Sequence, residues 1–313
     1  METLYLKTLV VAVDSGSFSK AATVLNITQS AVSQRIKFLE DRYGYQLLDR
    51  SGPVLVATEA GRVVLAKAEE ILRIESELSN ELKHMEGKPR LSLCCTPTFG
   101  IVYLPNVLNR FILQNADIVD LKFMFYTPEQ AIKGLHENEF DVGVIEHCEA
   151  LELSEFKTFQ LPRDELVFIS SPCLQLPSID VDIDHLLPHR LIARKVGCSS
   201  RKLLELNMTA IGRSLKDFKR MIIYDDLRLT IDTVIGGGGI AFVSRSLVKK
   251  QLEEGSLLEH RLPGFTHNRF RTVALNKKRT PDKVLQNFMD CIFTTFPSVS
   301  VDEEGDSNQN CRL

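Results

Sequence analysis

The segment from Glu59 to Met85 contains no proline and repeats apolar and charged residues, and this feature most limits how the chain can fold. The apolar residues recur at the spacing of one helix face. They are Val63, Val64, Leu65, Ala68, Ile71, Leu72, Leu78 and Leu82. A helix of roughly seven turns is too long to bury that face on a small helical domain alone. We therefore expect it to pair with a second copy of the chain; the alternative is a solvated connector.

Composition places the chain among globular proteins. Of its 313 residues, 44% are hydrophobic and 25% are charged, and the net charge is −3. This length suffices for two or three compact units. No apolar run is long enough to span a membrane, and the first residues lack a signal-peptide pattern, so we expect a cytoplasmic protein with no membrane partner. The charge argues against a protein that coats nucleic acid, but not against binding at one DNA site.

The cysteines and histidines show no metal-binding spacing. No Cys-x-x-Cys or His-Glu-x-x-His pattern occurs, so we expect reduced, mostly buried thiols and neither a metal nor a cofactor. There is also no Gly-x-Ser-x-Gly elbow and no hydrolase order of Ser, His and Asp. We therefore expect a protein that is not an enzyme.

Short helices precede the long one. Apolar spacing predicts a first helix that ends at Gly16, with Ser17 as the N-cap of the second. Thr28 can cap a third helix from Gln29 to about Tyr43. The residues of this third helix that we expect to face inward are Ala31, Val32, Ile36 and Leu39.

The outer face of the third helix carries amides, hydroxyls and one cation. These are Gln29, Ser30, Ser33, Gln34 and Lys37. Amides and hydroxyls can bond base edges in a major groove, cations can bond phosphates, and the helix start at Thr28 favours a phosphate. A small helical hairpin with a polar outer face would show the same pattern. The net charge of this segment of the chain is also only mildly positive. From the residues alone, both interpretations stay open.

Five short sequence motifs in this region resemble those of one protein family. The chain reads Gly-Ser-Phe-Ser-Lys-Ala-Ala at 16–22, Leu-Asn-Ile-Thr-Gln-Ser-Ala-Val-Ser-Gln-Arg-Ile at 25–36, Leu-Glu at 39–40, Leu-Leu-Asp-Arg at 47–50 and Thr-Glu-Ala-Gly at 58–61. This part resembles the LysR-type regulators of bacterial transcription. The resemblance implies an α+β multidomain protein with an N-terminal winged helix-turn-helix, a long linker helix and a C-terminal effector domain. That effector domain would have two α/β subdomains, like a periplasmic binding protein. Such regulators bind DNA as dimers or tetramers and change its bend when an effector binds.

Carried over position by position, the resemblance predicts the DNA contacts. Its groove residues are Thr28, Gln29, Ser30, Ser33 and Gln34, its phosphate contacts are Arg35 and Lys37, and its wing contact is Arg50. The wing itself is predicted from a turn at 49–53 and strand residues at 54–56. Many members have Ser-Arg-Gln-Ile where this chain has Ser-Gln-Arg-Ile at 33–36, so the family's base preference does not transfer. The wing also has fewer arginines than is usual in the family.

After Gly87-Lys88-Pro89 the pattern changes to strands alternating with helices, which indicates an α/β domain with a mainly parallel sheet. We predict a DNA-binding domain at 1–58, a linker helix at 59–87, an effector domain at 88–297 and a disordered tail at 298–313. Subdomain I would cover about 90–162 and 268–297, and subdomain II about 163–267. Strand candidates are 91–95, 121–126, 142–145, 166–170, 191–193, 222–224, 240–243 and 272–275. Helix candidates include 104–114, 128–138, 200–208 and 281–293.

Hydroxyl groups follow three predicted strands, each just before a predicted helix. Combined with the family's cleft positions, they give the candidate effector residues Thr96, Thr98, Thr127, Cys198, Ser199 and Ser200. Hydroxyls and free N–H groups at helix starts suit a carboxylate or another anion, and Arg194, Lys195 and Arg201 add positive charge. The alternative is plain capping, and Thr127, Pro128 and Gln130 have the pattern of a capping box. The glycine run at 236–239 predicts chain reversal and close packing, because no phosphate-binding lysine follows it.

Cys198 opens a second way of switching. It lies at a helix start beside Lys195 and Arg201, where a thiol pKa can fall, and the family's peroxide-sensing branch has a reactive cysteine at a similar place. The following helix, however, lacks a second cysteine. We thus expect double-stranded DNA, a small-molecule effector and further copies of the chain as partners, with RNA polymerase as an additional candidate. An enzyme or a solute-binding protein with an incidental helical N-terminus is the competing hypothesis.

Overall fold

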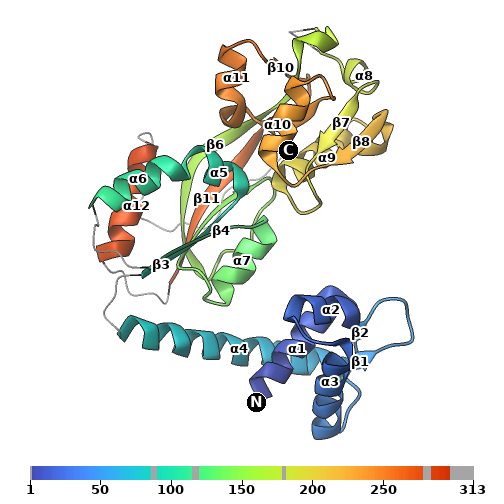
Figure 1. Ribbon diagram of the computed structural model, residues 1–313, viewed down its shortest axis with the longest axis vertical. Coiled ribbons are helices and arrows are strands. Elements are labelled where there is room, and N and C mark those ends of the chain that lie inside the picture. The colour runs from blue at the N-terminus through green and yellow to red at the C-terminus, as the bar shows by residue number, and fades with distance from the viewer. Residues whose placement is uncertain (1, 86–89, 115–119, 178–180, 278–282, 297–313) are drawn as a thin grey trace. The chain divides into compact units, whose positions relative to one another are not determined.

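The computed structural model describes residues 2–85, 90–114, 120–177, 181–277 and 283–296. The chain forms two compact units: an N-terminal unit of the first 87 residues, and a C-terminal unit of residues 88–313 apart from His136–Asn138. Each unit is shown in Figure 1. The expected tail at 298–313, and residues 86–87 of the expected linker, lie outside the described residues. In the ranges given above, no helix is both apolar and long enough to cross a bilayer.

The N-terminal unit is helical with a two-stranded wing. Its elements are α1 Glu2–Ser15, α2 Phe18–Leu25, α3 Gln29–Tyr43, β1 Leu48–Asp49, β2 Val56–Ala57 and α4 Glu59–Met85. The core contains small Ala21 and Ala22 of α2, which let α3 cross closely with Val32, Ile36 and Leu39. The inward-facing positions expected for α3 are confirmed except Ala31, which is half-buried.

The turns between these helices explain why glycine, asparagine and threonine occur at their positions in the sequence. Gly16 has a φ of 63°, and Asn26 ends α2 with a φ of 52°, conformations that glycine and asparagine adopt at low cost. Thr28 caps α3 as expected, since its Oγ1 accepts from the N–H of Ala31 over 3.2 Å. Ser17 occupies the N-cap position of α2, but its side chain makes no capping hydrogen bond, so that part of the expectation was wrong.

The wing strand lies later than predicted. Residues 54–56 were expected to be extended, but β2 pairs with β1 through Ala57 opposite Leu48 and Val56 opposite Asp49. Leu48 is fully buried and fixes this register, because a shift by one residue would turn it to solvent.

Helix α4 is amphipathic over its whole length, and the N-terminal unit covers only part of its apolar face. Ala68 is buried in the core, and Val64, Leu65 and Leu72 pack against it. Further along, Ile74, Leu78 and Leu82 are 53%, 56% and 55% exposed. An exposed apolar stripe of this kind is typical of a helix that pairs with a partner.

The C-terminal unit is built on a seven-stranded sheet in the order β10-β6-β11-β5-β3-β4, with β9 also paired to β6. Its strands are β3 Arg90–Cys95, β4 Asp120–Phe125, β5 Val142–His147, β6 Phe156–Ser170, β9 Ala241–Ser244, β10 Leu258–His260 and β11 Asn268–Asn276. A separate two-stranded sheet holds β7 Arg190–Ala193 and β8 Arg220–Ile223. The helices are α5 Pro97–Val102, α6 Leu104–Gln114, α7 Pro128–His136, α8 Ile183–Leu186, α9 Ser199–Ala210, α10 Leu227–Ile235, α11 Lys249–Glu253 and α12 Lys283–Thr295.

The expectation of a mainly parallel sheet was wrong. Only β3 pairs in parallel with β4 and β5 in the large sheet, whereas β6 and β11 run antiparallel to their neighbours. β6 is one continuous strand of 15 residues. Its first part pairs with β11, and its last residues pair with β9 and β10. It therefore passes from one half of the unit, which holds β3, β5 and β11, into the other half, which holds β9 and β10 (Figure 1). Every predicted strand overlaps an observed one, while β10 and the helices α5, α8 and α11 were not predicted.

Alternation along the strands divides the core between two sheet faces. In β3, Leu93 joins a cluster with Phe111 of α6 and Phe288 of α12, while the next residue, Cys94, faces Leu135 of α7. Burial raises the pKa of the Cys94 thiol to about 12, which keeps it protonated, as expected of a small core residue. All six cysteines in the described part of the chain are free.

The glycine run at 236–239 packs closely, as predicted. A Cβ on Gly239 would lie 2.3 Å from the carbonyl oxygen of Arg190, and Gly237 has a φ of 76°. This close approach lets Ile240 pair with β7: the N–H of Ile240 donates to the carbonyl of Arg190, and the N–H of Ile192 donates to the carbonyl of Ile240.

Candidate functional site

The outer face of α3 is the candidate DNA-reading surface. Thr28, Gln29, Ser30, Gln34 and Lys37 are exposed and Ser33 is half-buried. The Thr28 and Ser30 hydroxyls are 2.9 Å apart at the start of the helix. The face thus presents amides, hydroxyls and a cation to solvent while Val32, Ile36 and Leu39 hold the helix to the core.

Both predicted DNA-contact arginines have partners within the N-terminal unit. Arg35 donates from Nη1 to Thr8 Oγ1 over 3.2 Å and lies 5.9 Å from the Tyr5 ring centre. Arg50 is ion-paired with Glu40, with 2.8 Å between Nη2 and Oε2. Both guanidinium groups therefore stabilise the fold. A DNA phosphate that binds either arginine would have to share it with these protein partners.

Glu40 connects the wing to α3. Besides Arg50, its Oε1 accepts from the backbone N–H of Leu47 over 3.0 Å and of Leu48 over 3.4 Å. One carboxylate thus satisfies the amides that lead into β1 and positions the arginine of the wing.

The C-terminal unit contains a cavity of about 390 Å³. Helices α5, α7, α9 and α10 all begin at its edge. The six predicted effector residues all line it: Thr96, Thr98, Thr127, Cys198, Ser199 and Ser200. These residues come from segments up to about a hundred positions apart, and they meet because each segment follows a strand that ends at the cavity.

Several of these hydroxyls already have protein partners. Thr96 Oγ1 donates to Glu146 Oε2 over 2.9 Å, and Thr98 Oγ1 accepts from Arg269 Nη2 over 3.0 Å. Thr127 forms the predicted capping box with Gln130, since its N–H donates to Oε1 and its Oγ1 accepts from the Gln130 N–H. Capping thus accounts for Thr127 without a ligand.

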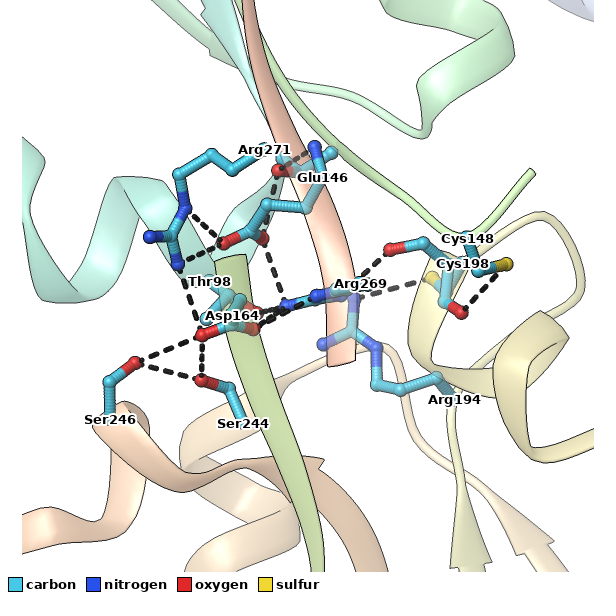
Figure 2. Close-up of polar contacts among 12 residues, drawn as sticks. Thr98, Glu146, Cys148, Asp164, Arg194, Cys198, Ser244, Ser246, Arg269 and Arg271 are labelled. Carbon is cyan, nitrogen blue, oxygen red and sulfur yellow. Dashed lines mark hydrogen bonds and ion pairs between the residues drawn. The ribbon is translucent and has the colours of Figure 1, made fainter. Parts of the chain in front are cut away.

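The floor of the cavity includes Glu146 and Arg269, which belong to a buried charge network that the sequence did not reveal. Arg269 and Arg271 of β11, Glu146 of β5 and Asp164 of β6 are each at most 3% exposed. Each arginine contacts both carboxylates, at 2.7 to 3.0 Å for the Nη2 atoms (Figure 2). Burial opposes the charge of Arg271, but the nearby carboxylates outweigh it and raise the arginine pKa.

The network also bonds to neighbouring elements. Arg269 Nη1 donates to Ser199 Oγ of the cavity lining over 2.7 Å, and Asp164 Oδ1 accepts from Ser244 Oγ of β9 over the same distance. Glu146 directly follows the predicted strand 142–145, so a charged residue at a strand end was the one signal that could have found it. Arg269 and Asp164 gave no such signal, because the two residues of this pair are 105 positions apart in the sequence.

Cys198 lies at the start of α9 among cationic side chains. Its Sγ accepts from Arg194 Nη2 over 3.6 Å. The Cys148 thiol contacts the same turn, donating to the Ser199 carbonyl over 3.8 Å (Figure 2). In the described ranges, no group of three or more His, Cys, Asp or Glu side chains could hold a metal.

Comparisons with known proteins cover both units. Residues 5–62 match the bacterial regulatory helix-turn-helix protein, lysR family, and residues 85–297 match the LysR substrate binding domain. A probable RuBisCO transcriptional regulator of Cyanophora paradoxa is 28% identical over 298 residues, covering 93% of this chain and 91% of its own. The uncharacterized HTH-type transcriptional regulator YeiE of Escherichia coli strain K12 is 26% identical over 250 residues, covering 80% and 82%.

Solved structures show the same fold at low identity. CbnR, a LysR family transcriptional regulator, aligns with a TM-score of 0.55 at 17% identity, covering 95% of this chain and 99% of its own. A cysteine-to-serine mutant of OxyR from Corynebacterium glutamicum, with hydrogen peroxide bound, aligns with a TM-score of 0.54 at 20% identity, covering 94% and 92%. Because both family models match and together span nearly the whole chain, the protein belongs to the LysR family of DNA-binding transcription regulators, with an effector-binding domain, and is not an enzyme.

Proposed function

We propose that this regulator reads DNA with the exposed face of α3 and is switched by a small anionic molecule, of the carboxylate class, in the cavity of the C-terminal unit. One observation carries the proposal: the cavity is lined from both halves of the unit, by α5 and α7 residues on one side and α9 and α10 residues on the other. A ligand that touches both walls binds one arrangement of the halves more tightly than another. Such differential affinity is what a switch requires.

For the DNA half, base contacts come from Gln29, Ser30, Ser33 and Gln34, with Thr28 at the helix start. Lys37 contacts phosphate. Arg35 and Arg50 approach phosphates while keeping the partners described above. Two copies of α3, held by paired α4 helices, would contact neighbouring half-sites in a dimer or tetramer. We place this protein in the cytoplasm. If it activates transcription, it would contact RNA polymerase.

A gel-shift assay on the DNA upstream of the protein's own gene tests the DNA half. Replacing Ser33 or Gln34 with alanine should weaken site-specific binding by about 1–3 kcal/mol each. Glu129→Ala, an exposed change in α7, serves as the control. Full retention of binding by both α3 variants would contradict the assignment of α3.

A second candidate is switching by thiol oxidation at Cys198. The observation that favours it is the contact between Cys198 Sγ and the Arg194 guanidinium, because reactive cysteines in proteins lie beside cationic side chains. Hydrogen peroxide would oxidise the Cys198 thiol to a sulfenic acid and itself be reduced to water. A Cys198→Ser variant whose DNA binding responds to peroxide as the unmodified protein does would remove this candidate.

A further inference from the structure

Among the described residues, one arginine that lines the cavity has a guanidinium nitrogen without a hydrogen-bond partner. Arg194 follows β7, lines the cavity and is 6% exposed. Its Nη2 donates to Asp225 Oδ1 over 3.2 Å and to Cys198 Sγ. Within the described part of the chain, its Nη1 is buried and has no hydrogen-bond partner. A buried donor without an acceptor costs free energy, and buried charged groups are rarely left so, which indicates an acceptor that a ligand would supply.

The other two cations of the cavity are committed. Arg269 uses all three guanidinium nitrogens, Nε on Asp164, Nη1 on Ser199 and Nη2 on Thr98 and Glu146. Lys195 pairs with Asp225 over 2.8 Å and is largely exposed. Of the two buried cations, Arg194 is therefore the one that can bind an incoming anion without breaking a buried pair.

The start of α9 supports the same position. This helix has 12 residues, and its N-cap, Cys198, makes no side-chain hydrogen bond to the first turn. The N–H groups of that turn thus remain available, and the helix dipole favours negative charge there. The half-buried Ser200 lies in this turn and also lines the cavity.

The opposite wall is apolar. Phe125 and Ile101 are 53% and 46% exposed although both line the cavity, and Pro97 and Tyr126 lie beside them. The charged lining residues are three cations, Arg194, Lys195 and Arg269, and three carboxylates, Glu146, Asp225 and Asp226. Their formal charges cancel, so the cavity suits one negative charge on an apolar body better than two.

We propose that Arg194 is the residue that recognises the effector, and that the effector is a monocarboxylic acid. Its carboxylate accepts from Arg194 Nη1 and from the first turn of α9, and its hydrocarbon part lies against Phe125 and Ile101. This assignment rests on the proposed function, in which the cavity is the effector site.

Calorimetric titration of the full chain tests the assignment. The probes are isovalerate and phenylacetate, each with its uncharged amide. We expect at least one acid to bind and its amide to bind at least tenfold more weakly. Arg194→Gln should weaken the acid roughly 10- to 100-fold, the loss of a charge-assisted hydrogen bond. Arg194→Lys keeps the charge but loses the two-pronged guanidinium, so its affinity for the acid should lie between those of the unmodified protein and Arg194→Gln. This variant also keeps the test decisive if Arg194→Gln misfolds.

The matched control is Arg213→Gln. Arg213 lies in the same half of the unit, pairs with one aspartate, Asp184, and does not line the cavity, so acid binding should stay unchanged. Equal binding of the acid by the unmodified protein and Arg194→Gln would overturn the assignment. If the amides bind as well as the acids, the cavity remains a ligand site but the monocarboxylate class fails. If all four probes fail to bind, the monocarboxylate class is overturned and the cavity loses its support as an effector site.

Discussion

Arg269 donates from Nη1 to Ser199 Oγ over 2.7 Å and so joins strand β11 to the first residue of α9. The Nη2 of the same guanidinium reaches Thr98 of α5 on the other wall, over 3.0 Å. One side chain therefore connects both walls of the cavity to the charged floor. A ligand that moves either wall has to stretch or replace these bonds, so we expect this arginine to couple cavity occupancy to the arrangement of the two halves.

The charge network should be costly to break. Glu146→Gln leaves two buried arginines with one carboxylate and should lower the free energy of unfolding by about 3–5 kcal/mol, as expected when one partner of a buried ion pair is removed. Urea denaturation measures this. Glu205→Gln, which breaks the more exposed pair with Arg201, should cost less than about 1 kcal/mol. A similar small loss for both variants would show that the buried network contributes little.

The stability of the protein should depend on pH through His260. Burial lowers the pKa of this histidine, whose Nε2 lies 2.7 Å from Ser170 Oγ and whose Nδ1 lies 2.8 Å from the Pro177 carbonyl oxygen. The unfolded chain then binds a proton more readily than the folded one. This contribution to stability is full above the unfolded pKa of about 6.5 and is lost as the pH falls through the lower, folded value. Melting temperatures should decline over that window, and His260→Gln should decline less; parallel curves would contradict the prediction.

Gly100 sets the position of the aromatic wall. A Cβ at this residue would lie 2.2 Å from Phe125 Cε1, so Gly100→Ala must displace the ring. We expect a loss of stability of about 1–3 kcal/mol from this overpacking, together with altered binding of any cavity ligand. Gly52→Ala in the wing meets its nearest atom only at 3.8 Å and is the control. Unchanged thermal unfolding of Gly100→Ala would show that the ring moves freely.

The exposed stripe on α4 should hold copies of the chain together. Ile74→Glu and Leu78→Glu place charges on a face that we expect to be buried between two α4 helices, so sedimentation should show a shift from dimer or tetramer to monomer. Glu70→Gln, on an exposed position of the same helix, should leave the assembly unchanged. If the glutamate variants assemble normally, α4 is a solvated connector.

Local signals predicted much of this structure. Thr28 before α3 and the Thr127–Gln130 box before α7 require only residues a few positions apart, and both caps formed as expected. The continuity of β6 was missed because Pro162 to Glu165 interrupt its apolar pattern. These polar residues are tolerated since Asp164 pairs with Arg269 and the Pro162 carbonyl accepts from Arg271, over 3.2 Å.

The residues of the candidate site also divide into those that local sequence signals predicted and those that they did not. The hydroxyls were predicted because they follow β3, β4 and β7, whose ends meet at the cavity, whereas the arginine–carboxylate floor depends on pairing between β5, β6 and β11. That pairing is long-range and leaves no trace in any window of the sequence. The family resemblance supplied the cleft positions but not the charge beneath them.

We infer that α3 reads bases through Gln34 while Lys37 contacts phosphate. Fluorescence anisotropy with the upstream duplex and a scrambled duplex, across a salt series, separates these two roles. Gln34→Ala should lose about 1–3 kcal/mol on the upstream duplex alone, whereas Lys37→Ala should weaken binding to both duplexes and reduce the salt slope by about one. Equal losses on both duplexes for Gln34→Ala, or no loss on either, would contradict this inference.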